Sequence, residues 1–321
     1  MKNFGMVGMN QGNGHPFSFT AVFNGFDEKA LEEQCDFPII RKYLKEHHAN
    51  RAFISTARVS HIWTQDSADS RRVAAVSKIP NVATSLEQLA DECDAIIFAR
   101  DDMQNHFRMA KELFKTGKPI YMDKMLCATP DELRALLDII GNDYPLLTAS
   151  SFRFAPNVAE AANFMKSHSP MTIHGISPCI WLRYAPHLLD ALFQICGRDV
   201  LWVQNTGFDG RDIVTVTFAN ELQAVLQIFD GICLPMGLTF HFKTPEKAYP
   251  VPYTDDTLYS YFHSIANMMI AFADMVENNT RPVPLKDTIL LNRVVLAGIE
   301  SREKGGTRID MDKFMPELIA R

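Results

Sequence analysis

Short apolar runs alternate with helix-compatible segments through the first 150 residues of this 321-residue chain. The run DAIIFA at Asp94–Ala99 is almost wholly apolar, which is typical of a strand buried on both faces of a parallel sheet. Strands that are joined through helical crossovers run parallel. The alternation therefore predicts a doubly wound, Rossmann-like parallel sheet over residues 1–150.

The elements of this first domain follow from local patterns. Strands are expected at Phe4–Met9, Ala57–Asp66, Asp94–Ala99, Pro119–Lys124 and Pro145–Ser151. Helices are expected at residues 26–35, 37–48, 67–78, 84–92, 103–118 and 129–141. The first two are separated near Pro38, because proline lacks the N–H that a helix interior needs.

After residue 150 the pattern changes to consecutive strands with short turns. We expect strands at residues 171–181, 200–208, 212–220, 222–231 and 236–243, one helix at Pro186–Cys196, and closing helices at 258–277 and 285–304. Strands joined by short links pair antiparallel. The fold class is therefore α/β, with a Rossmann-like domain at 1–150 and an α+β domain with an open, mainly antiparallel sheet at 151–321.

The composition of the chain limits the classes of molecule that it is expected to bind. The net charge of −6 argues against nucleic acid or an anionic membrane, since both favour a basic surface. No stretch approaches the roughly 20 apolar residues that span a bilayer. The six cysteines, Cys35, Cys93, Cys127, Cys179, Cys196 and Cys233, form no C-x-x-C pair, and the histidine spacing gives no metal site. We expect a cytoplasmic protein that binds small molecules and no metal.

A glycine-rich turn follows the first expected strand. Its glycines fit G-x-G-x-x-G in no register. Small residues would let a pyrophosphate approach the backbone near a helix N-terminus, and asparagines tolerate unusual backbone angles. An ordinary turn is the alternative. The residues that would hold a cofactor there are Gly8, Asn10, Gly12, Asn13 and Gly14.

Two further segments carry candidate proton-transfer groups. Lys124 follows an apolar strand, where burial or a nearby cation would tune its pKa for acid–base work. His187 and Asp190 lie three residues apart at the expected start of a helix, preceded by Arg183 and Tyr184. A surface lysine and a packing histidine are the alternatives.

The order of these parts resembles the glucose–fructose oxidoreductase / inositol dehydrogenase / MocA family of NAD(P)-dependent oxidoreductases. DAIIFA, His106, TGK and MDKM follow the family's central signature. SSFRFAP, with Arg153, corresponds to its R-x-x-P segment, and His187 with Asp190 to its D-x-x-x-H-x-x-D helix.

The resemblance implies roles for these residues. Lys124 would hydrogen-bond the nicotinamide ribose and the substrate hydroxyl, and His187 would be the general acid/base during hydride transfer to or from a sugar, cyclitol or related substrate. His106 and Asp123 would belong to the cofactor site. Substrate-binding residues would be Arg153, Arg183, Tyr184 and Asp190.

This sequence departs from the family pattern at several positions. Asn10 stands near the second glycine, Asp123 replaces Glu, and Met125 replaces a proline that commonly follows a cis bond, so the local turn is expected to differ. Arg183 replaces an acid, which suggests an anionic group on the substrate. Residues 22–51 form an extra segment beside the cofactor or at a subunit contact.

The choice between NAD and NADP stays open. An acid at the end of the second strand normally binds the ribose 2′-hydroxyl of NAD. Here Thr64 and Gln65 occupy that point, and Asp66 follows, with Arg71 and Arg72 beyond it. The missing early acid permits NADP, and Asp66 permits NAD.

Two alternatives to a dehydrogenase remain. One is a redox-neutral enzyme of the same fold with tightly held NAD, and the other is a non-catalytic binding protein. The open face of the second sheet predicts a homodimer or homotetramer.

Overall fold

The computed structural model describes residues 1–232 and 236–319, with Gln104 described by its backbone alone. The chain forms two compact units. The first comprises Met1–Leu126, Arg134–Thr148 and Ile265–Val283, and the second Cys127–Leu133, Ala149–Ser264 and Pro284–Arg321. Each unit thus takes most of one predicted half of the chain and a short segment of the other.

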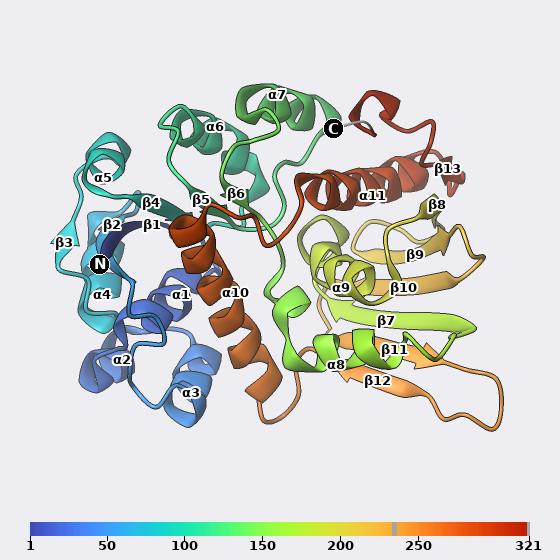
Figure 1. Ribbon diagram of the computed structural model, residues 1–321, viewed down its shortest axis with the longest axis horizontal. Helices are drawn as coiled ribbons and strands as arrows, with labels where there is room; N and C mark the ends of the chain where they lie inside the picture. The colour runs from blue at the N-terminus through green and yellow to red at the C-terminus, as the bar shows by residue number, and fades with distance from the viewer. Residues whose placement is uncertain (233–235, 320–321) are drawn as a thin grey trace. The chain divides into compact units, whose positions relative to one another are not determined.

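The first unit contains a six-stranded parallel sheet in the order β3-β2-β1-β4-β5-β6 (Figure 1). Its strands are β1 Lys2–Val7, β2 Ala57–Trp63, β3 Asn81–Val82, β4 Ala95–Phe98, β5 Ile120–Met122 and β6 Leu146–Leu147. The strand order reverses between β1 and β4, so their carboxyl ends form the switch point at which such sheets bind ligands. The predicted Rossmann-like sheet is confirmed.

Helices cover both faces of this sheet. They are α1 His15–Asn24, α2 Glu28–Gln34, α3 Pro38–His47, α4 Ser67–Val76, α5 Leu86–Glu92, α6 Met103–Phe114, α7 Pro130–Ile140 and α10 Tyr259–Asn278. On one face Phe4 of β1 contacts Phe23 of α1 and Phe272 of α10. On the other face a Cβ at Gly5 would meet Leu89 of α5 at 2.4 Å, so glycine permits the close approach of α5.

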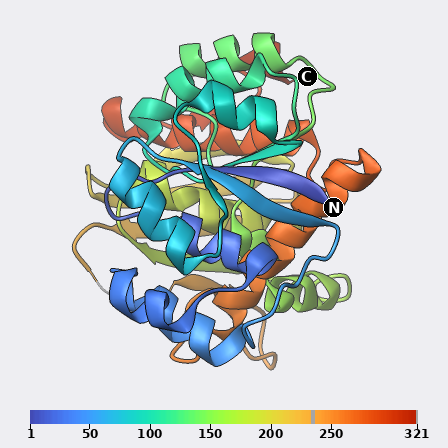
Figure 2. The same cartoon turned by 90° about the vertical axis from the view of Figure 1, so that its left-hand side faces the viewer.

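The segment between β1 and β2 holds three helices, and the sequence analysis missed the first. α1 reads HPFSFTAVFN, and its residues Pro16 to Phe23 are all buried. A helix that is buried all round shows no amphipathic stripe, which is why its pattern was not recognised. The break before Pro38 is confirmed, and Figure 2 shows α2 and α3 side by side in blue.

The second unit contains a seven-stranded sheet in the order β12-β11-β7-β10-β9-β8-β13. Its strands are β7 Thr172–Pro178, β8 Val200–Asn205, β9 Arg211–Phe218, β10 Gln223–Phe229, β11 Gly237–His241, β12 Tyr249–Pro252 and β13 Ile309–Asp310. The pair β7–β10 is parallel and the other pairs are antiparallel, so the predicted mainly antiparallel sheet is confirmed. Along β10 buried residues alternate with partly exposed ones, which gives the sheet one covered face.

The helices of this unit are α8 Pro156–Phe164, α9 Trp181–Cys196 and α11 Leu285–Glu303, with 3-10 turns at Ser151–Phe154 and Pro316–Leu318. The predicted start of α9 at Pro186 is wrong, because the helix begins five residues earlier. Trp181 is buried, its indole donates to Val295 O at 2.9 Å, and it packs where Gly298 of α11 lacks a Cβ. This anchor continues the helix through the proline, so His187 lies inside α9 and not at its start.

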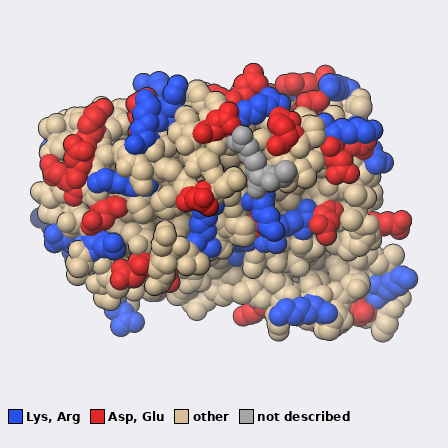
Figure 3. Space-filling view, turned by 45° about the horizontal axis from the view of Figure 1, so that its top comes forward, with Lys and Arg blue, Asp and Glu red and all other residues tan. Residues whose placement is uncertain are grey.

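Charge is mixed over the surface. Figure 3 shows acidic and basic side chains interspersed on the face in view. Within residues 1–232 and 236–319, no helix is both long enough and apolar enough to cross a bilayer.

Candidate functional site

The glycine-rich turn between β1 and α1 is tight, and its glycines differ in surroundings. The Asn13 N–H donates to Asn10 O at 3.0 Å. A Cβ at Gly8 would meet Pro16 at 2.5 Å, and one at Gly14 would meet Ile40 at 2.5 Å, so both serve internal packing. Gly12 is exposed, has φ +76°, and a Cβ there would meet nothing within 4 Å. Only the tip of the turn, at Gly12, therefore leaves room for a ligand against the backbone.

The first residues of α1 offer few N–H groups to a ligand. The His15 N–H donates to Asn13 Oδ1 at 2.8 Å, Pro16 has no N–H, and the Phe17 N–H donates to Gly14 O at 3.1 Å. A pyrophosphate would have to use the N–H groups of the turn rather than those of the first helical residues.

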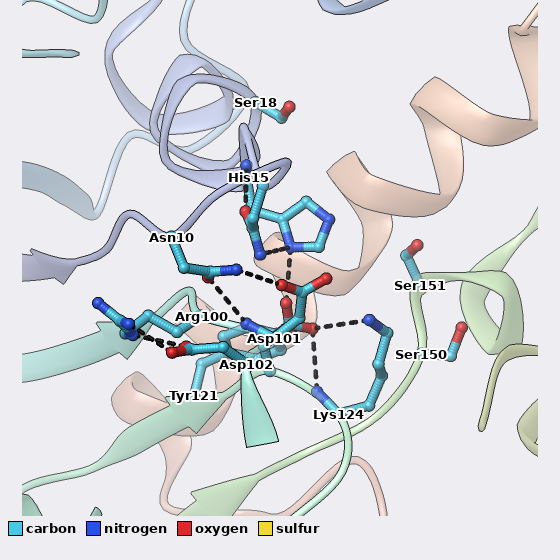
Figure 4. Close-up of polar contacts among 12 residues, drawn as sticks. Asn10, His15, Ser18, Arg100, Asp101, Asp102, Tyr121, Lys124, Ser150 and Ser151 are labelled. Atoms are coloured by element: carbon cyan, nitrogen blue, oxygen red, sulfur yellow. Dashed lines mark hydrogen bonds and ion pairs between the residues drawn. The ribbon is translucent and has the colours of Figure 1, made fainter. Parts of the chain in front are cut away.

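Charged side chains at the end of β4 hold this turn in place (Figure 4). Asn10 donates to Asp101 Oδ1 at 2.9 Å and accepts from the Asp101 N–H at 3.3 Å. Arg100 donates to Met9 O at 2.8 Å and binds both oxygens of Asp102, at 2.7 and 2.6 Å. Arg100 and Asp101 were missed in the sequence analysis, although they directly follow DAIIFA.

Asp123 and Lys124 lie at the end of β5. The Asp123 carboxylate lies 2.6 Å from His15 Nδ1, 3.9 Å from the Lys124 ammonium and 3.4 Å from the Tyr121 hydroxyl. Asp123 and Lys124 are only 2% and 4% exposed. Burial alone would raise the pKa of Asp123, but Lys124 and His15 outweigh it and hold that pKa below its usual value. The site therefore keeps an ionised carboxylate between an imidazole and an ammonium group.

His106 connects α6 to this edge of the sheet. Its Nδ1 lies 2.9 Å from Met125 O, and its Nε2 contacts Arg100 O. Burial lowers the pKa of this fully buried ring. Both ring nitrogens of His106 thus lie against backbone carbonyls, and its predicted part in cofactor binding stays a prediction. The peptide bond between Lys124 and Met125 is cis.

A pocket of about 500 Å³ lies at the carboxyl end of β2. It is lined by Trp63, Thr64, Gln65, Ser67, Ser70, Arg71, Val82, Ala83 and Thr84. Asp66 is not among the lining residues, and its carboxylate instead caps α4 by accepting the Ala68 N–H at 2.8 Å. Arg71, which donates to Ser67 at 3.2 Å, is thus the one charged side chain in the lining.

In the second unit, His187 of α9 is held by Ser150. The Ser150 hydroxyl lies 2.6 Å from His187 Nδ1. The rings of Tyr184 and Tyr253 lie 5.4 and 5.5 Å from the imidazole ring. Tyr253 is buried, which raises its pKa well above the usual value and keeps its hydroxyl neutral.

The predicted substrate ligands Arg153 and Asp190 bind each other. Arg153 donates to Asp190 at 2.9 Å and to Asp287 at 3.1 Å, and all three side chains are buried. Asp190 also accepts the Ser150 N–H at 2.7 Å. These bonds commit both residues to the fold around α9, so their substrate role stays a prediction that the contacts do not favour. Arg183 lies in the first turn of α9, where its N–H donates to Ile180 O at 3.2 Å.

Metal ligands do not cluster: within the part of the chain that the structure describes, no group of three or more His, Cys, Asp or Glu residues could hold a metal ion. The described cysteines are free thiols, and Cys233 lies outside the described residues.

Part of the chain matches a known protein family. Residues 39–143 match the family model described as oxidoreductase family, NAD-binding Rossmann fold (GFO_IDH_MocA). This match confirms the predicted resemblance, and with it the expected enzyme class and nicotinamide cofactor at the level of the family. The matched range begins after the glycine-rich turn. No curated protein sequence matches the chain significantly.

Several solved structures share the fold over nearly the whole chain. A putative myo-inositol dehydrogenase from Sinorhizobium meliloti 1021 is 14% identical with a TM-score of 0.71, over 97% of this chain and 100% of that one. A scyllo-inositol dehydrogenase from Lactobacillus casei, solved with NAD(H) and scyllo-inositol, is 11% identical with a TM-score of 0.73, over 97% and 99%. An oxidoreductase from Agrobacterium radiobacter, solved with NAD+, L-tartaric acid and magnesium, is 13% identical with a TM-score of 0.72, over 96% and 98%. At these identities the likeness shows the fold alone.

Proposed function

We propose that the chain is an NAD(P)-dependent dehydrogenase that moves a hydride between the nicotinamide and the CH–OH carbon of a sugar, cyclitol or related hydroxylated acid. The observation that carries the proposal is Lys124, buried beside the ionised Asp123 at the carboxyl edge of a Rossmann-like sheet. The family match supports the enzyme class, and the scyllo-inositol and tartrate found with the structural neighbours support a polyhydroxylated substrate.

The residues present fit a dinucleotide at two places. Gly12 leaves the backbone of the turn open, and the pocket at the end of β2 lies where the adenosine ribose binds in this type of sheet. That pocket presents Arg71 and no carboxylate, so we propose that it accepts the 2′-phosphate of NADP in preference to NAD.

Within this proposal the bound nicotinamide supplies the hydride acceptor. The Lys124 ammonium donates hydrogen bonds to the ribose and to the substrate oxygen, where it stabilises the developing negative charge. His187 exchanges the hydroxyl proton through Nε2, because its Nδ1 faces Ser150.

Two measurements test the function in order. A thermal-shift assay with NAD and with NADP detects binding, because a ligand that binds only the folded state raises its apparent stability. A panel of inositols, aldoses and hydroxy acids is then assayed for the absorbance of reduced nicotinamide. Binding followed by reduction of the cofactor supports the proposal. Turnover without net absorbance change indicates the redox-neutral alternative, and failure to bind either dinucleotide indicates a non-catalytic protein.

Arg183 selects an anionic substrate in this proposal. A guanidinium group pairs with a carboxylate through two hydrogen bonds. In Arg183→Ala we expect KM to rise for a uronic acid and to stay unchanged for the matched aldose. If Arg183→Ala changes the KM of neither substrate, the proposal that the substrate carries an anionic group is wrong.

We also propose that the partly exposed face of the second sheet packs against a second copy of the chain. Ile176, Ile213 and Val225 are only partly buried on that face. Light scattering after size exclusion should give a dimer or tetramer, and Val225→Lys should shift it toward monomer; a monomeric unaltered protein would refute this.

A further inference from the structure

We infer that Ser150 is a positioning residue for His187, and that its hydroxyl fixes which nitrogen of the ring exchanges a proton. The inference rests on the proposed function, in which His187 takes the substrate proton. In the sequence Ser150 lies only at the end of an expected strand, and no motif marks it.

Ser150 is a polar anchor on the Nδ1 side of the His187 ring. The Ser150 hydroxyl lies 2.6 Å from Nδ1, and Ser150 is 1% exposed. The rings of Tyr184 and Tyr253 pack near the imidazole, at 5.4 and 5.5 Å. These rings limit the side chain's movement, but only a hydrogen bond distinguishes its two nitrogens.

Ser150 is itself held firmly. Its N–H donates to Asp190 Oδ2 at 2.7 Å, and its Oγ accepts the Phe152 N–H at 3.1 Å. Asp190 is fixed in turn by Arg153 at 2.9 Å. His187 and Asp190 lie three residues apart on one face of α9, so the same helix binds both the side chain and the backbone of Ser150.

Proton transfer follows from this arrangement. The Phe152 N–H occupies one lone pair of Ser150 Oγ, which leaves one lone pair and one O–H that could face His187 Nδ1. In our inference the lone pair accepts the His187 Nδ1–H. The neutral ring then carries its lone pair on Nε2. In the oxidation, the substrate O–H bond breaks and an Nε2–H bond forms, while the C–H electron pair leaves as the hydride. The Nδ1–H bond to Ser150 is kept throughout, so the ring does not turn during the step.

The tautomer of His187 can be measured without any activity. We would record ¹⁵N–¹H correlation spectra of the full chain, with His187→Gln to assign the signals. We expect the neutral ring to be protonated at Nδ1 in the unaltered protein and in Ser150→Thr, which keeps the hydroxyl. Ser150→Ala should revert to the Nε2–H form that free histidine prefers. If Ser150→Ala does not fold, Ser150→Cys replaces it in the test, because a thiol is similar in size to the hydroxyl but a weaker hydrogen-bond partner.

Ser177→Ala is the matched control. Ser177 is fully buried in the same unit, but its hydroxyl donates to Pro178 O at 3.1 Å. This variant should leave the His187 spectrum unchanged. An Nε2–H ring in the unaltered protein, or the same tautomer with and without the Ser150 hydroxyl, would overturn the inference.

Kinetics gives an independent readout once a substrate is known. Ser150→Ala should lower kcat by about 10-fold, less than the ~10²–10⁴-fold that the positioned acid–base group itself contributes, and leave KM unchanged. Ser150→Thr should restore most of kcat. A change in KM alone would contradict the role. If the unaltered protein oxidises no hydroxyl compound, the proposed dehydrogenase fails, whereas the tautomer measurement still decides the part played by Ser150.

Discussion

Two buried aspartates, one in each unit, respond to burial in opposite ways. Asp123 at the end of β5 and Asp190 on α9 are 2% and 3% exposed, and each lies beside a cation. The pKa of Asp123 lies below its usual value, whereas burial raises the pKa of Asp190 above it. Proximity to a cation therefore does not by itself keep a buried carboxylate charged.

The partners of each carboxylate explain the difference. Asp123 faces both Lys124 and His15, whose combined effect exceeds the effect of burial. Asp190 has Arg153, which it shares with Asp287, and the Ser150 N–H, and together these do not offset the effect of burial. A neighbouring carboxylate raises both pKa values, Asp287 at Asp190 and Asp101 at Asp123. The first unit thus concentrates charge at its strand ends, and the second unit presents His187 to a neutral hydroxyl.

The largest effect is expected from Lys124 and His187, the two side chains for which we propose a role in proton transfer. Lys124→Met and His187→Gln should each lower kcat by roughly 10²–10⁴-fold, because each removes a positioned proton donor or acceptor. If both act on the same step, the double variant should lose much less than the product of the two single effects. Steady-state kinetics on all three variants checks this. Losses that multiply in full would assign the two side chains to separate steps.

The second prediction compares how much stability each of the two aspartates contributes. Asp190→Asn and Asp123→Asn should each lower the free energy of unfolding by about 3–5 kcal/mol near neutral pH, because each removes a carboxylate that pairs with a buried cation, Arg153 or Lys124. Denaturant unfolding at a series of pH values measures the difference in stability between each variant and the unaltered protein.

The pH dependence of that difference should have opposite sign for the two variants. The lowered pKa of Asp123 contributes stability that is present above about pH 4 and lost as the pH falls through the folded-state pKa, so the effect of Asp123→Asn shrinks in acid. The raised pKa of Asp190 makes the folded state hold its proton longer, so stability falls as the pH rises above about 4 and the effect of Asp190→Asn shrinks in that direction. The same sign in both series would refute the comparison.

The sequence predicted regular elements better than it predicted polar partners. DAIIFA was recognised because an almost wholly apolar run is typical of a strand buried on both faces. The strands after residue 150 were recognised because short turns separate them. Helix α1 was missed because it is buried on all sides and has no amphipathic stripe. The first turn of α9 was missed because a proline inside a helix resembles a helix start. His15 and Asp123 are 108 residues apart, and Ser150 and His187 are 37 apart. Such pairs form only when the fold brings together strand ends and helix faces, and no spacing rule encodes them.

The third prediction concerns the cation at the end of β2. Arg71→Ala should raise KM for NADP by about 10–100-fold, the loss expected for a hydrogen bond to a charged group, and should change KM for NAD little. Arg72→Ala is a matched control, because the neighbouring Arg72 pairs with Asp36 and Asp69 and does not line the pocket. Equal effects on both cofactors would remove Arg71 from the choice between them.

The smallest effect is expected from substitution of His15. It tests how much the imidazole contributes to the low pKa of Asp123. His15→Gln keeps a hydrogen-bond donor beside Asp123 but removes the imidazole, so the pKa of that carboxyl should rise toward its usual value while Lys124 holds it partly down. Since the His15 side chain is 22% exposed, the loss of stability should be only about 1 kcal/mol. His61→Gln is the control, because His61 pairs at 2.7 Å with Glu92, a half-exposed carboxylate that water can stabilise. Acid unfolding should shift to higher pH in His15→Gln and not in His61→Gln. Equal curves would mean that Lys124 keeps Asp123 ionised without the help of the imidazole.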